Sequence, residues 1–325
     1  MDVSIIVVNW NTCEFLRQCI DSVYAHTRYA LFEIIVVDNA SEDGSVDMLR
    51  REFPAVIRIE NQQNRGFAAG NNEGILAARG KYVLLLNPDT RVFDLAIDRA
   101  FRFAEEHPRA AVVGCRVHDL RDNKVQFTCH EFPSLTNLAV RICGLADLAP
   151  RSRFFGRAMM TWWDYDDVRE VEAVAGCFMF VRREAIRGVG MLDEDYFMYG
   201  EDIDWCFRFG QAGWKVLFCP DVEIEHFTGE SSKKCSRAME VERRRSLMLF
   251  FTKHRGGFVA FLANGLFVIN ELLRLGWWGL VWAVKVARGR CAEQERSGIG
   301  SKFARLRFHL SGRAVTRGGE ARSNR

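Results

Sequence analysis

The N-terminal part of the chain alternates short apolar runs with segments of helical periodicity. Val3–Asn9 is a β-rich apolar run, Glu14–Ala25 repeats its apolar residues with helical spacing, and Glu33–Val37 is another apolar run that ends at Asp38. Continuously apolar strands joined by a helix are typical of parallel strands that are buried on both faces. The pattern therefore predicts a β-α-β unit at the start of the chain.

The same alternation continues beyond Asp38. It predicts a helix over Asp43–Phe53, a strand over Val56–Ile59, a helix over Phe67–Ala78 and a strand over Tyr82–Leu86. Strands that alternate with helices in this way indicate an α/β fold, with a mainly parallel sheet and helices on both of its faces.

The pattern is weaker in the middle of the chain. From Cys115 to Glu170 the apolar residues follow no clear period, so no element is predicted there. Beyond this stretch we expect a strand over Val171–Val181, a helix over Glu201–Gln211 and a strand over Lys215–Cys219.

Two apolar stretches stand near the C-terminus. Gly256–Asn270 and Leu275–Val284 are 15 and 10 residues long and are separated by Glu271 and Arg274, whereas a spanning helix needs about 20 apolar residues. The second stretch holds three tryptophans and is followed by basic residues, a combination typical of helices in a membrane interface. We expect an interfacial helix pair over 256–287; a buried helical hairpin and a tilted spanning helix are the alternatives.

Composition adds a charge asymmetry to this pattern. The chain has 325 residues, is 48% hydrophobic and carries a formal net charge of +3, but residues 285–325 alone hold 11 Lys and Arg against 3 Asp and Glu. A basic end of this kind suggests an anionic partner, either lipid or nucleic acid, or alternatively a solvated, disordered end. We expect an anionic membrane surface as partner and no nucleic acid. The expected organisation is a catalytic domain over 1–230, a helical, membrane-interfacial segment over 231–290 and a basic, flexible tail over 291–325.

The N-terminus and the cysteines bear on the compartment. The chain begins with a strand-like run rather than with a basic stretch followed by an apolar one, so we expect no signal peptide. Several of the 10 cysteines, such as Cys177 and Cys219, lie inside apolar runs, which fits reduced thiols. The expected location is cytoplasmic, peripheral on the cytoplasmic face of the inner membrane.

Polar side chains follow three of the predicted strands at the point where each strand ends. In open α/β sheets ligands bind at the carboxyl ends of the strands, so these residues are candidates for one shared crevice. They are Asn9 and Asn11, Asp38 and Asn39, and Asn87 and Asp89. The alternative is that Asn and Asp stand there only because they favour turns.

A second acidic group opens the predicted helix over Glu201–Gln211. Acids favour helix N-termini, and Asp204 can pair with Arg208 four residues on, so Asp204 is expected to be structural. Glu201 and Asp202 are adjacent carboxylates that oppose each other's ionisation, which favours one of them as a general base. Asp89 is expected to bind Mg²⁺ or Mn²⁺ through its carboxylate, and His226 to complete the metal shell or, alternatively, to be structural.

The segment Asn64-Arg65-Gly66-Phe67 opens another predicted helix. Its free backbone amides and Arg65 are candidates for phosphate binding. Gly66, Gly70 and Gly74 recur every four residues, however, which is explained more simply by close packing of the helix on the sheet. No G-x-G-x-x-G follows the first strand and no P-loop Gly-Lys-Ser/Thr occurs, which argues against a dinucleotide-dependent dehydrogenase and a P-loop enzyme.

Taken together, these segments resemble glycosyltransferase family 2, over residues 3–229 and most closely its rhamnosyltransferase-like branch. The segments that carry the resemblance are Val3–Asn11, Val36–Ser41, Asn64–Phe67 with Gly70-Asn71-Asn72, Asn87-Pro88-Asp89 and Glu201–Trp205. The resemblance implies a GT-A fold, inversion at the anomeric carbon and a divalent metal.

The resemblance also implies roles for single residues. Asp38 and Asn39 would contact the base and ribose of a nucleotide-sugar donor, and Asp202 would be the catalytic base. Asp89 would be the last acid of the family's Asp-x-Asp metal motif, with His226, 24 residues after Asp202, as a further metal ligand. The first acid of that motif is Asn87 here, a neutral and weaker ligand, which makes the metal dependence a question for experiment.

Under this interpretation the chain transfers a sugar from a nucleoside diphosphate donor, with thymidine-diphosphate rhamnose as first candidate, to a glycan or lipid-linked glycan in bacterial cell-surface polysaccharide synthesis. Two alternatives stay open at this point. One is an inactive nucleotide-sugar-binding scaffold that recruits a membrane assembly, and the other is a sugar nucleotidyltransferase, which would release pyrophosphate.

Overall fold

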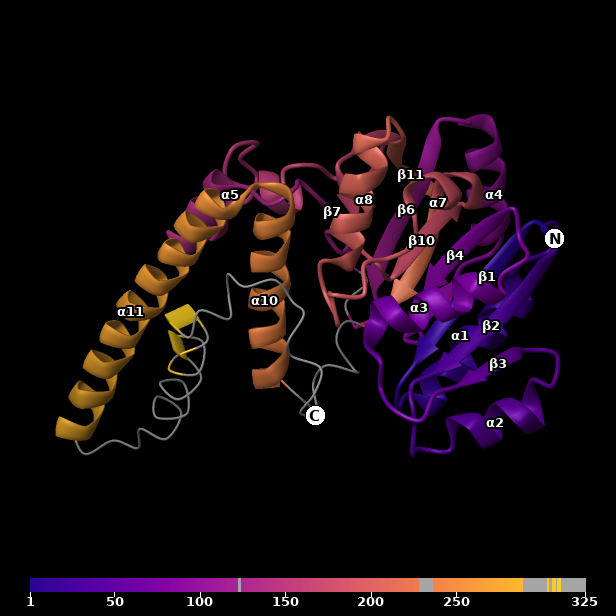
Figure 1. Cartoon of the computed structure of the whole chain (residues 1–325), viewed down its shortest axis with the longest axis horizontal. Helices are drawn as coiled ribbons and strands as arrows, with labels where there is room; N and C mark the ends of the chain where they lie inside the picture. The colour runs from indigo at the N-terminus through magenta and orange to yellow at the C-terminus, as the bar shows by residue number, and fades with distance from the viewer. Residues whose placement is uncertain (122–123, 228–235, 289–302, 304–305, 308, 311–325) are drawn as a thin grey trace. The chain divides into compact units, whose positions relative to one another are not determined.

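The structure is a computed structural model that describes residues 1–121, 124–227, 236–288, 303, 306–307 and 309–310 (Figure 1). It divides into two compact units. The first is formed by Met1–Phe132 and Arg151–Lys234, and the second by Pro133–Pro150 and Cys235–Arg325. Most of the basic tail expected over 291–325 lies outside the described residues.

The first unit is built on one large sheet. Its strands are β1 (Val3–Asn9), β2 (Phe32–Asp38), β3 (Ile57–Glu60), β4 (Tyr82–Leu86), β5 (Thr90–Val92), β6 (Ala110–Asp119), β8 (Arg169–Val171), β10 (Phe178–Arg182) and β11 (Lys215–His226). The order is β3-β2-β1-β4-β10-β6-β11-β5, with β8 also paired to β11. A separate two-stranded sheet pairs β7 (Cys129–His130) with β9 (Ala173–Val174).

The predicted α/β sheet is confirmed, but its parallel part is confined to two regions. β3, β2, β1 and β4 are mutually parallel, as are β6 and β11. β10 stands between these groups and runs antiparallel to both β4 and β6. The sheet is therefore mixed. The carboxyl ends of the parallel strands β1, β2 and β4 lie at the same end of the sheet.

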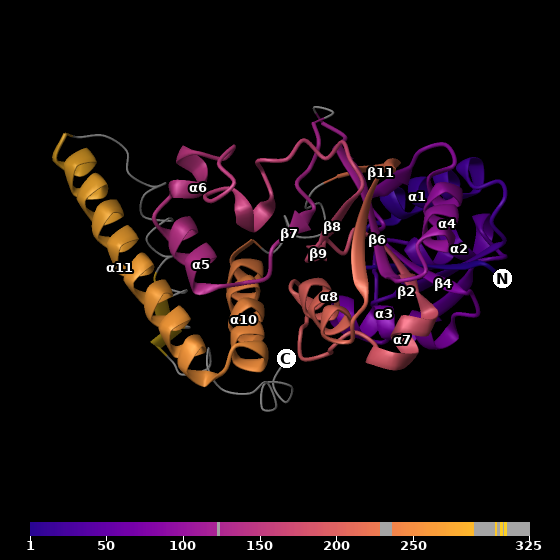
Figure 2. The ribbon, with the colours of Figure 1, turned by 90° about the horizontal axis from the view of Figure 1, so that it is seen from above.

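Helices cover both faces of this sheet (Figure 2). They are α1 (Cys13–His26), α2 (Ser45–Glu52), α3 (Gly66–Ala77), α4 (Ala96–Glu106), α7 (Arg183–Val189) and α8 (Glu201–Gln211), with a 3-10 turn at Arg157–Met159. α1, α2 and α4 pack on one face, and α3, α7 and α8 on the other. Alternate residues of each strand serve the two cores, for example Ile5 in one and Ile6 in the other, as expected for strands buried on both sides.

Two strand predictions were wrong in their limits. The single strand expected over Val171–Val181 is divided into β8, β9 and β10, because the chain turns at Ala175–Cys177 and begins to pair with β4 only at Phe178. The strand expected over Lys215–Cys219 continues as β11 to His226, and an irregularity in its register with β6 accommodates the residues between Cys219 and Glu223.

The second unit is helical. It contains α5 (Leu135–Ile142), α6 (Leu145–Leu148), α10 (Ser236–His254) and α11 (Gly257–Ala287). Met248 and Phe251 of α10 pack against Ala263 and Phe267 of α11, and Leu138 of α5 joins this core. The segment 133–150, for which the sequence predicted no element, thus belongs to the same unit as the C-terminal helices.

α11 is one continuous helix of 31 residues, not the pair of shorter helices expected over 256–287. The charges that interrupt the apolar pattern lie inside it: Glu271 is fully buried and its carboxylate lies 3.6 Å from the guanidinium of Arg244 on α10. Pairing with a neighbouring helix allows the acid to stand within α11 without ending it. By length and composition α11 is also the one described helix that could cross a membrane.

Candidate active site

The ends of β1 and β2 are joined by a compact set of hydrogen bonds. Asn9 and Asp38 are register partners, and the side-chain amide of Asn9 donates to Asp38 Oδ1 at 2.8 Å. The other carboxylate oxygen of Asp38 accepts a bond from the backbone N–H of Ser41 at 2.8 Å. Both residues are almost fully buried. In this state Asn9 holds the Asp38 carboxylate in place and does not present its amide to solvent.

Asn11 completes this turn from the other side. Its backbone N–H donates to the hydroxyl of Ser41 at 2.9 Å, and its side-chain oxygen accepts from the N–H of Glu42 at 2.8 Å. Asn11 has a φ of 55°, in the left-handed region that Asn tolerates better than most residues. The two strand ends predicted to lie side by side are therefore bonded to each other.

Asn39 connects this strand edge to the start of α3. Its side-chain amide donates to the carbonyl of Gly66 at 3.1 Å, and its oxygen accepts from Asn61 at 3.1 Å. The side chain of Asn64 accepts from the N–H of Gly66 at 2.9 Å. The segment that opens α3 is thereby fixed beside Asp38 and Asn39.

Gly66 has a φ of 85°, and a Cβ there would lie 2.3 Å from the carbonyl oxygen of Phe197. At Gly70 and Gly74 a Cβ would approach Val8 and Ile6 of β1 to 3.0 and 2.4 Å, so the expected close packing of α3 on the sheet is confirmed. The amide of Asn71, which is buried, donates to Phe67 four residues earlier at 2.9 Å. Asn71 therefore stabilises the helix start itself.

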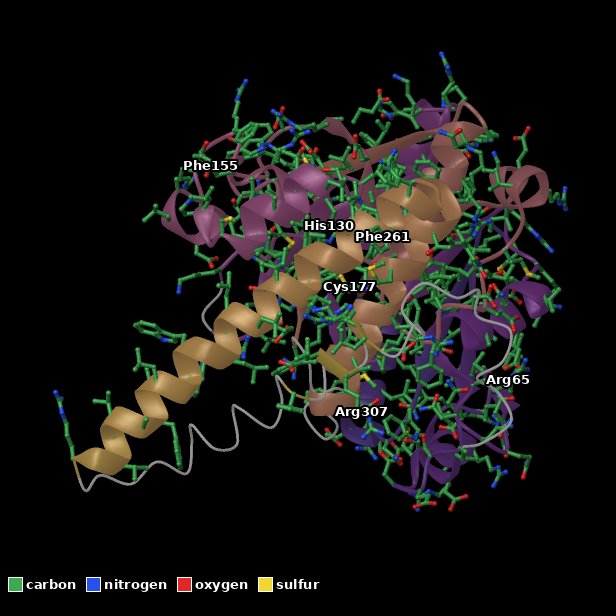
Figure 3. The ribbon with its side chains drawn as sticks, turned by 60° about the vertical axis from the view of Figure 1, so that its left-hand side comes forward. Arg65, His130, Phe155, Cys177, Phe261 and Arg307 are labelled. Atoms are coloured by element: carbon green, nitrogen blue, oxygen red, sulfur yellow. The ribbon has the colours of Figure 1, made fainter. Side chains whose placement is uncertain are left out.

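Arg65 is exposed at the surface of the first unit, beside the start of α3 (Figure 3). Its guanidinium forms an ion pair with Glu73 and lies 3.8 Å from Glu194. The cation that the sequence suggested for phosphate binding thus has two carboxylate neighbours in this state.

Asn87, Asp89 and His226 meet where β4 ends and β11 ends. The Nε2 atom of His226 lies 3.4 Å from Asp89 Oδ1 and 3.4 Å from the side-chain nitrogen of Asn87. Antiparallel pairing of His226 with Thr90 on β5 brings the histidine to this place. One carboxylate oxygen and one imidazole nitrogen are donors suited to Mg²⁺ or Mn²⁺. Among the described residues no group of three or more His, Cys, Asp and Glu gathers at metal-binding distances.

Asp202 stands in the first turn of α8 and is half-buried. Tyr199 and Gly200, with φ values of 68° and 86°, turn the chain into this helix. Asp202 Oδ2 accepts a hydrogen bond from the backbone N–H of Gly176 at 2.9 Å. A left-handed φ at a Tyr is uncommon and concentrates at functional sites, since folding has to stabilise it by other contacts.

The turn Gly176–Cys177 connects the two acidic centres. The carbonyl of Cys177 accepts from the N–H of Asn87 at 3.1 Å, while the N–H of Gly176 donates to Asp202. Burial, together with the nearby carboxylates of Asp89 and Asp202, raises the pKa of the Cys177 thiol to about 12. Asp202 and the group of Asn87, Asp89 and His226, distant in the sequence, therefore lie around one short piece of main chain.

The other acids of the α8 start behave differently. Asp204 is buried and bonded to the guanidinium of Arg208 at 2.8 Å, which confirms its expected structural role. Glu201 is also buried, so Asp202 is the more exposed of the two adjacent carboxylates. The sequence did not point to Gly176 and Cys177, since a backbone contact carries no side-chain signal.

Comparison with known proteins places the chain in a family. The family model described as glycosyl transferase family 2 matches residues 4–189, more than half of the chain. An N-acetylglucosaminyl-diphospho-decaprenol L-rhamnosyltransferase of Mycobacterium tuberculosis is 27% identical over 236 residues, which cover 69% of this chain and 76% of that protein. The rhamnosyltransferase WbbL of Escherichia coli K12 is 23% identical over 240 residues, or 71% and 85% of the two chains.

The fold also matches a solved structure. The mannosyltransferase PcManGT from Pyrobaculum calidifontis, in complex with GDP-Man and Mn²⁺, aligns with a TM-score of 0.57 over 96% of this chain and 86% of its own, at 18% identity. This likeness confirms the predicted GT-A fold. The chain therefore belongs to glycosyl transferase family 2 and is a glycosyltransferase similar to the rhamnosyltransferase-like branch of that family.

Proposed function

We propose that the chain transfers a sugar with inversion from a nucleoside diphosphate donor to a glycan or lipid-linked glycan, in cell-surface polysaccharide synthesis. Rhamnose from thymidine-diphosphate rhamnose is the first candidate, because two relatives are named rhamnosyltransferases and one of those names contains a lipid diphosphate acceptor. The observation that carries the proposal is the approach of Asp89 and Asp202 to the same turn, Gly176–Cys177. A donor bound between them would have an acid on each side.

Asp202 is the proposed base, with Glu201 beside it. Asp202 accepts the proton of an acceptor hydroxyl, whose oxygen forms a bond to the anomeric carbon. The bond from that carbon to the diphosphate oxygen breaks on the opposite face, and its electron pair leaves with the nucleoside diphosphate. One displacement of this kind inverts the configuration.

Asp89 and His226 fit a divalent metal, since their donor atoms are 3.4 Å apart and of the right chemistry. When bound, Mg²⁺ or Mn²⁺ supplies positive charge that stabilises the departing diphosphate. Asp89 and His226 would hold this ion beside the diphosphate of the donor. Asn87, a neutral residue, lies in the same place, so we expect weaker metal binding than an acid would give.

The remaining residues predicted to contact the donor stand at the ends of β1 and β2 and at the start of α3. We propose that Asp38 and Asn39 contact the base and ribose, with Asn9 and Asn11 holding that turn. The start of α3 follows this turn along the chain. It is fixed by hydrogen bonds of Asn64, Gly66 and Asn71, and Arg65 stands beside them. For Arg65 to bind phosphate, it would have to exchange Glu73 and Glu194 for the donor.

A donor-hydrolysis screen tests this function. The purified chain is incubated with several nucleotide sugars, with and without Mn²⁺, and released nucleoside diphosphate is measured. We expect release from thymidine-diphosphate rhamnose, increased by Mn²⁺. Binding of donors without release from any of them, with and without a membrane glycan extract, would favour the scaffold alternative. Release of pyrophosphate from a nucleoside triphosphate would favour the nucleotidyltransferase.

We also propose that α11 binds an anionic membrane surface at the cytoplasmic face of the inner membrane. Large apolar side chains are exposed along the whole helix, and Phe261 shows their position (Figure 3). They are Phe258, Phe261, Leu262, Ile269, Leu272, Leu273, Trp277, Leu280, Trp282, Val284 and Val286. Between Leu272 and Arg288 the only charged residues are basic, which suits anionic headgroups.

The packing of α11 favours insertion into one leaflet of the membrane over a helix that crosses the membrane. Its first half packs against the charged helix α10, with Glu271 paired to Arg244, and cannot enter hydrocarbon alone. The 16 residues from Leu272 to Ala287 extend about 24 Å, less than the hydrocarbon core of about 30 Å. We therefore propose that this second half enters the interface without crossing it.

Leu273→Glu should weaken vesicle binding. Leu273 is 67% exposed, and burying a Leu side chain in an apolar phase contributes ~1.5–3 kcal/mol, so we expect about a tenfold loss or more. The measurement is flotation of the full chain with phosphatidylglycerol-containing vesicles and with neutral ones. Leu148→Glu, at an even more exposed leucine of α6 (81%), is the control and should float like wild type. Equal flotation of all three proteins, or resistance to alkaline extraction, would contradict the proposal.

A further inference from the structure

The side chain of Gln126 holds His226 through two hydrogen bonds. The Gln126 amide nitrogen lies 3.0 Å from the backbone oxygen of His226, and its oxygen lies 3.1 Å from the Nδ1 atom of the ring. Gln126 is itself anchored, because its backbone N–H donates to Val117 of β6 at 2.8 Å. The side-chain amide of Gln126 thus bonds to both the main chain and the imidazole ring of His226.

The chemistry of these atoms fixes their roles. A backbone carbonyl only accepts hydrogen bonds, so the Gln126 group that faces it is the NH₂ group. The amide oxygen then faces Nδ1 and can only accept, which requires the proton of a neutral imidazole to stand on Nδ1. The reversed amide would place two oxygens against each other and lose the bond to the His226 carbonyl.

The consequence appears at the other ring nitrogen. With the proton on Nδ1, Nε2 carries the free electron pair, and Nε2 is the atom that lies 3.4 Å from Asp89 Oδ1. The side-chain nitrogen of Asn87, also at 3.4 Å, can donate to that electron pair. Two electron-rich atoms, His226 Nε2 and Asp89 Oδ1, thus lie side by side, and a cation bound to both would stabilise this arrangement.

We propose that Gln126 is a positioning residue that fixes the Nδ1–H tautomer of His226 and presents Nε2, beside Asp89, to a divalent cation. Metal-binding histidines commonly donate their second nitrogen to an oxygen acceptor, and loss of that acceptor typically lowers metal affinity 10–100-fold. Gln126 lies in the stretch from Cys115 to Glu170, where the sequence carried no pattern. The inference rests on the proposed metal role of His226.

The test compares Gln126→Leu, which removes both bonds, with Gln126→Glu, which keeps an acceptor for Nδ1–H. The ¹⁵N spectrum of the histidine rings in the metal-free full chain reports the tautomer, and His226→Asn assigns the signal. We expect Nδ1–H in wild type and Gln126→Glu, and its loss in Gln126→Leu. His118, whose Nε2 lies 2.7 Å from Glu223, is an internal reference that should not change.

A second readout measures Mn²⁺ affinity in the presence of a nucleoside diphosphate by electron paramagnetic resonance. We expect Gln126→Leu to bind Mn²⁺ about 10–100-fold more weakly than wild type, with recovery in Gln126→Glu. Gln211→Leu, the same change at an exposed glutamine on α8, should bind as wild type does. If Gln126→Leu does not fold, Gln126→Asn, one methylene shorter, takes its place.

The outcomes separate the two proposals. An Nε2–H tautomer in wild type, or an unchanged tautomer and Mn²⁺ affinity in Gln126→Leu, would overturn the role of Gln126. Wild type that has the Nδ1–H tautomer but does not bind Mn²⁺ with the nucleotide would overturn the metal role of His226, and with it the cation in this inference.

Discussion

Asp202→Asn is expected to lower kcat by about 10²–10⁴-fold, the range that general acid–base catalysis contributes. The amide cannot take the proton from the acceptor hydroxyl, but it keeps the shape of the carboxylate. The oxygen of the amide can still accept the bond from Gly176, so the fold of this region should be retained. The measurement is sugar transfer at saturating donor, together with the Kd of the nucleoside diphosphate, which should change little.

Asp204→Asn is the matched control in the same helical turn. It weakens the pairing with Arg208, so we expect a lower melting temperature with kcat close to that of wild type. Asp202→Asn should show the opposite pattern, with little change in melting temperature. Transfer by Asp202→Asn at the wild-type rate would remove Asp202 from the role of base.

Gly66→Ala is expected to destabilise the protein by about 2–5 kcal/mol. A left-handed φ costs a residue with a Cβ roughly 1–2 kcal/mol, and overpacking costs about 1–3 kcal/mol more. The new Cβ would meet the carbonyl of Phe197 at 2.3 Å, which is backbone and accepts a bond from Phe67 at 2.8 Å. Relief of the clash must therefore move main chain. The measurement is the free energy of unfolding in denaturant.

Gly44→Ala separates the two contributions. Gly44 has the same φ of 85° but nothing within 4 Å of a Cβ, so this variant should lose only the roughly 1–2 kcal/mol of the backbone conformation. Equal losses in Gly44→Ala and Gly66→Ala would show that the contact with Phe197 does not matter. Because Phe197 precedes α8, Gly66→Ala should also lower transfer activity, whereas Gly44→Ala should not.

The N-terminal part of the fold was readable from the sequence because its strands are apolar throughout. Val3–Asn9 and Tyr82–Leu86 were predicted with their observed limits, and so was Glu201–Gln211, where Gly200 precedes a turn of acids. A strand buried on both faces needs continuous apolar residues, and such a run has clear ends. The polar residues that end β1 and β2 do contact each other, and β4 runs parallel beside β1.

Three other features of the structure depend on contacts between distant segments, which the local pattern of the sequence does not contain. The direction of β10 is set by its neighbours β4 and β6, and an apolar run reads the same in either direction. Gly176 contacts the site through its main-chain N–H. Gln126 contacts it from a loop, where the sequence has no periodic pattern. The length of α11 was missed because Glu271 was taken as an interruption, while a partner on another helix permits its burial.

The turn at Gly176–Cys177 has a consequence for how the enzyme can vary. It bonds to Asn87 through a carbonyl and to Asp202 through an amide hydrogen, and every amino acid except proline supplies both groups. The distance between Asn87 and the proposed base Asp202 is thus set in part by the backbone of this turn. Side chains around the crevice can diversify toward new sugars while the geometry of displacement stays the same.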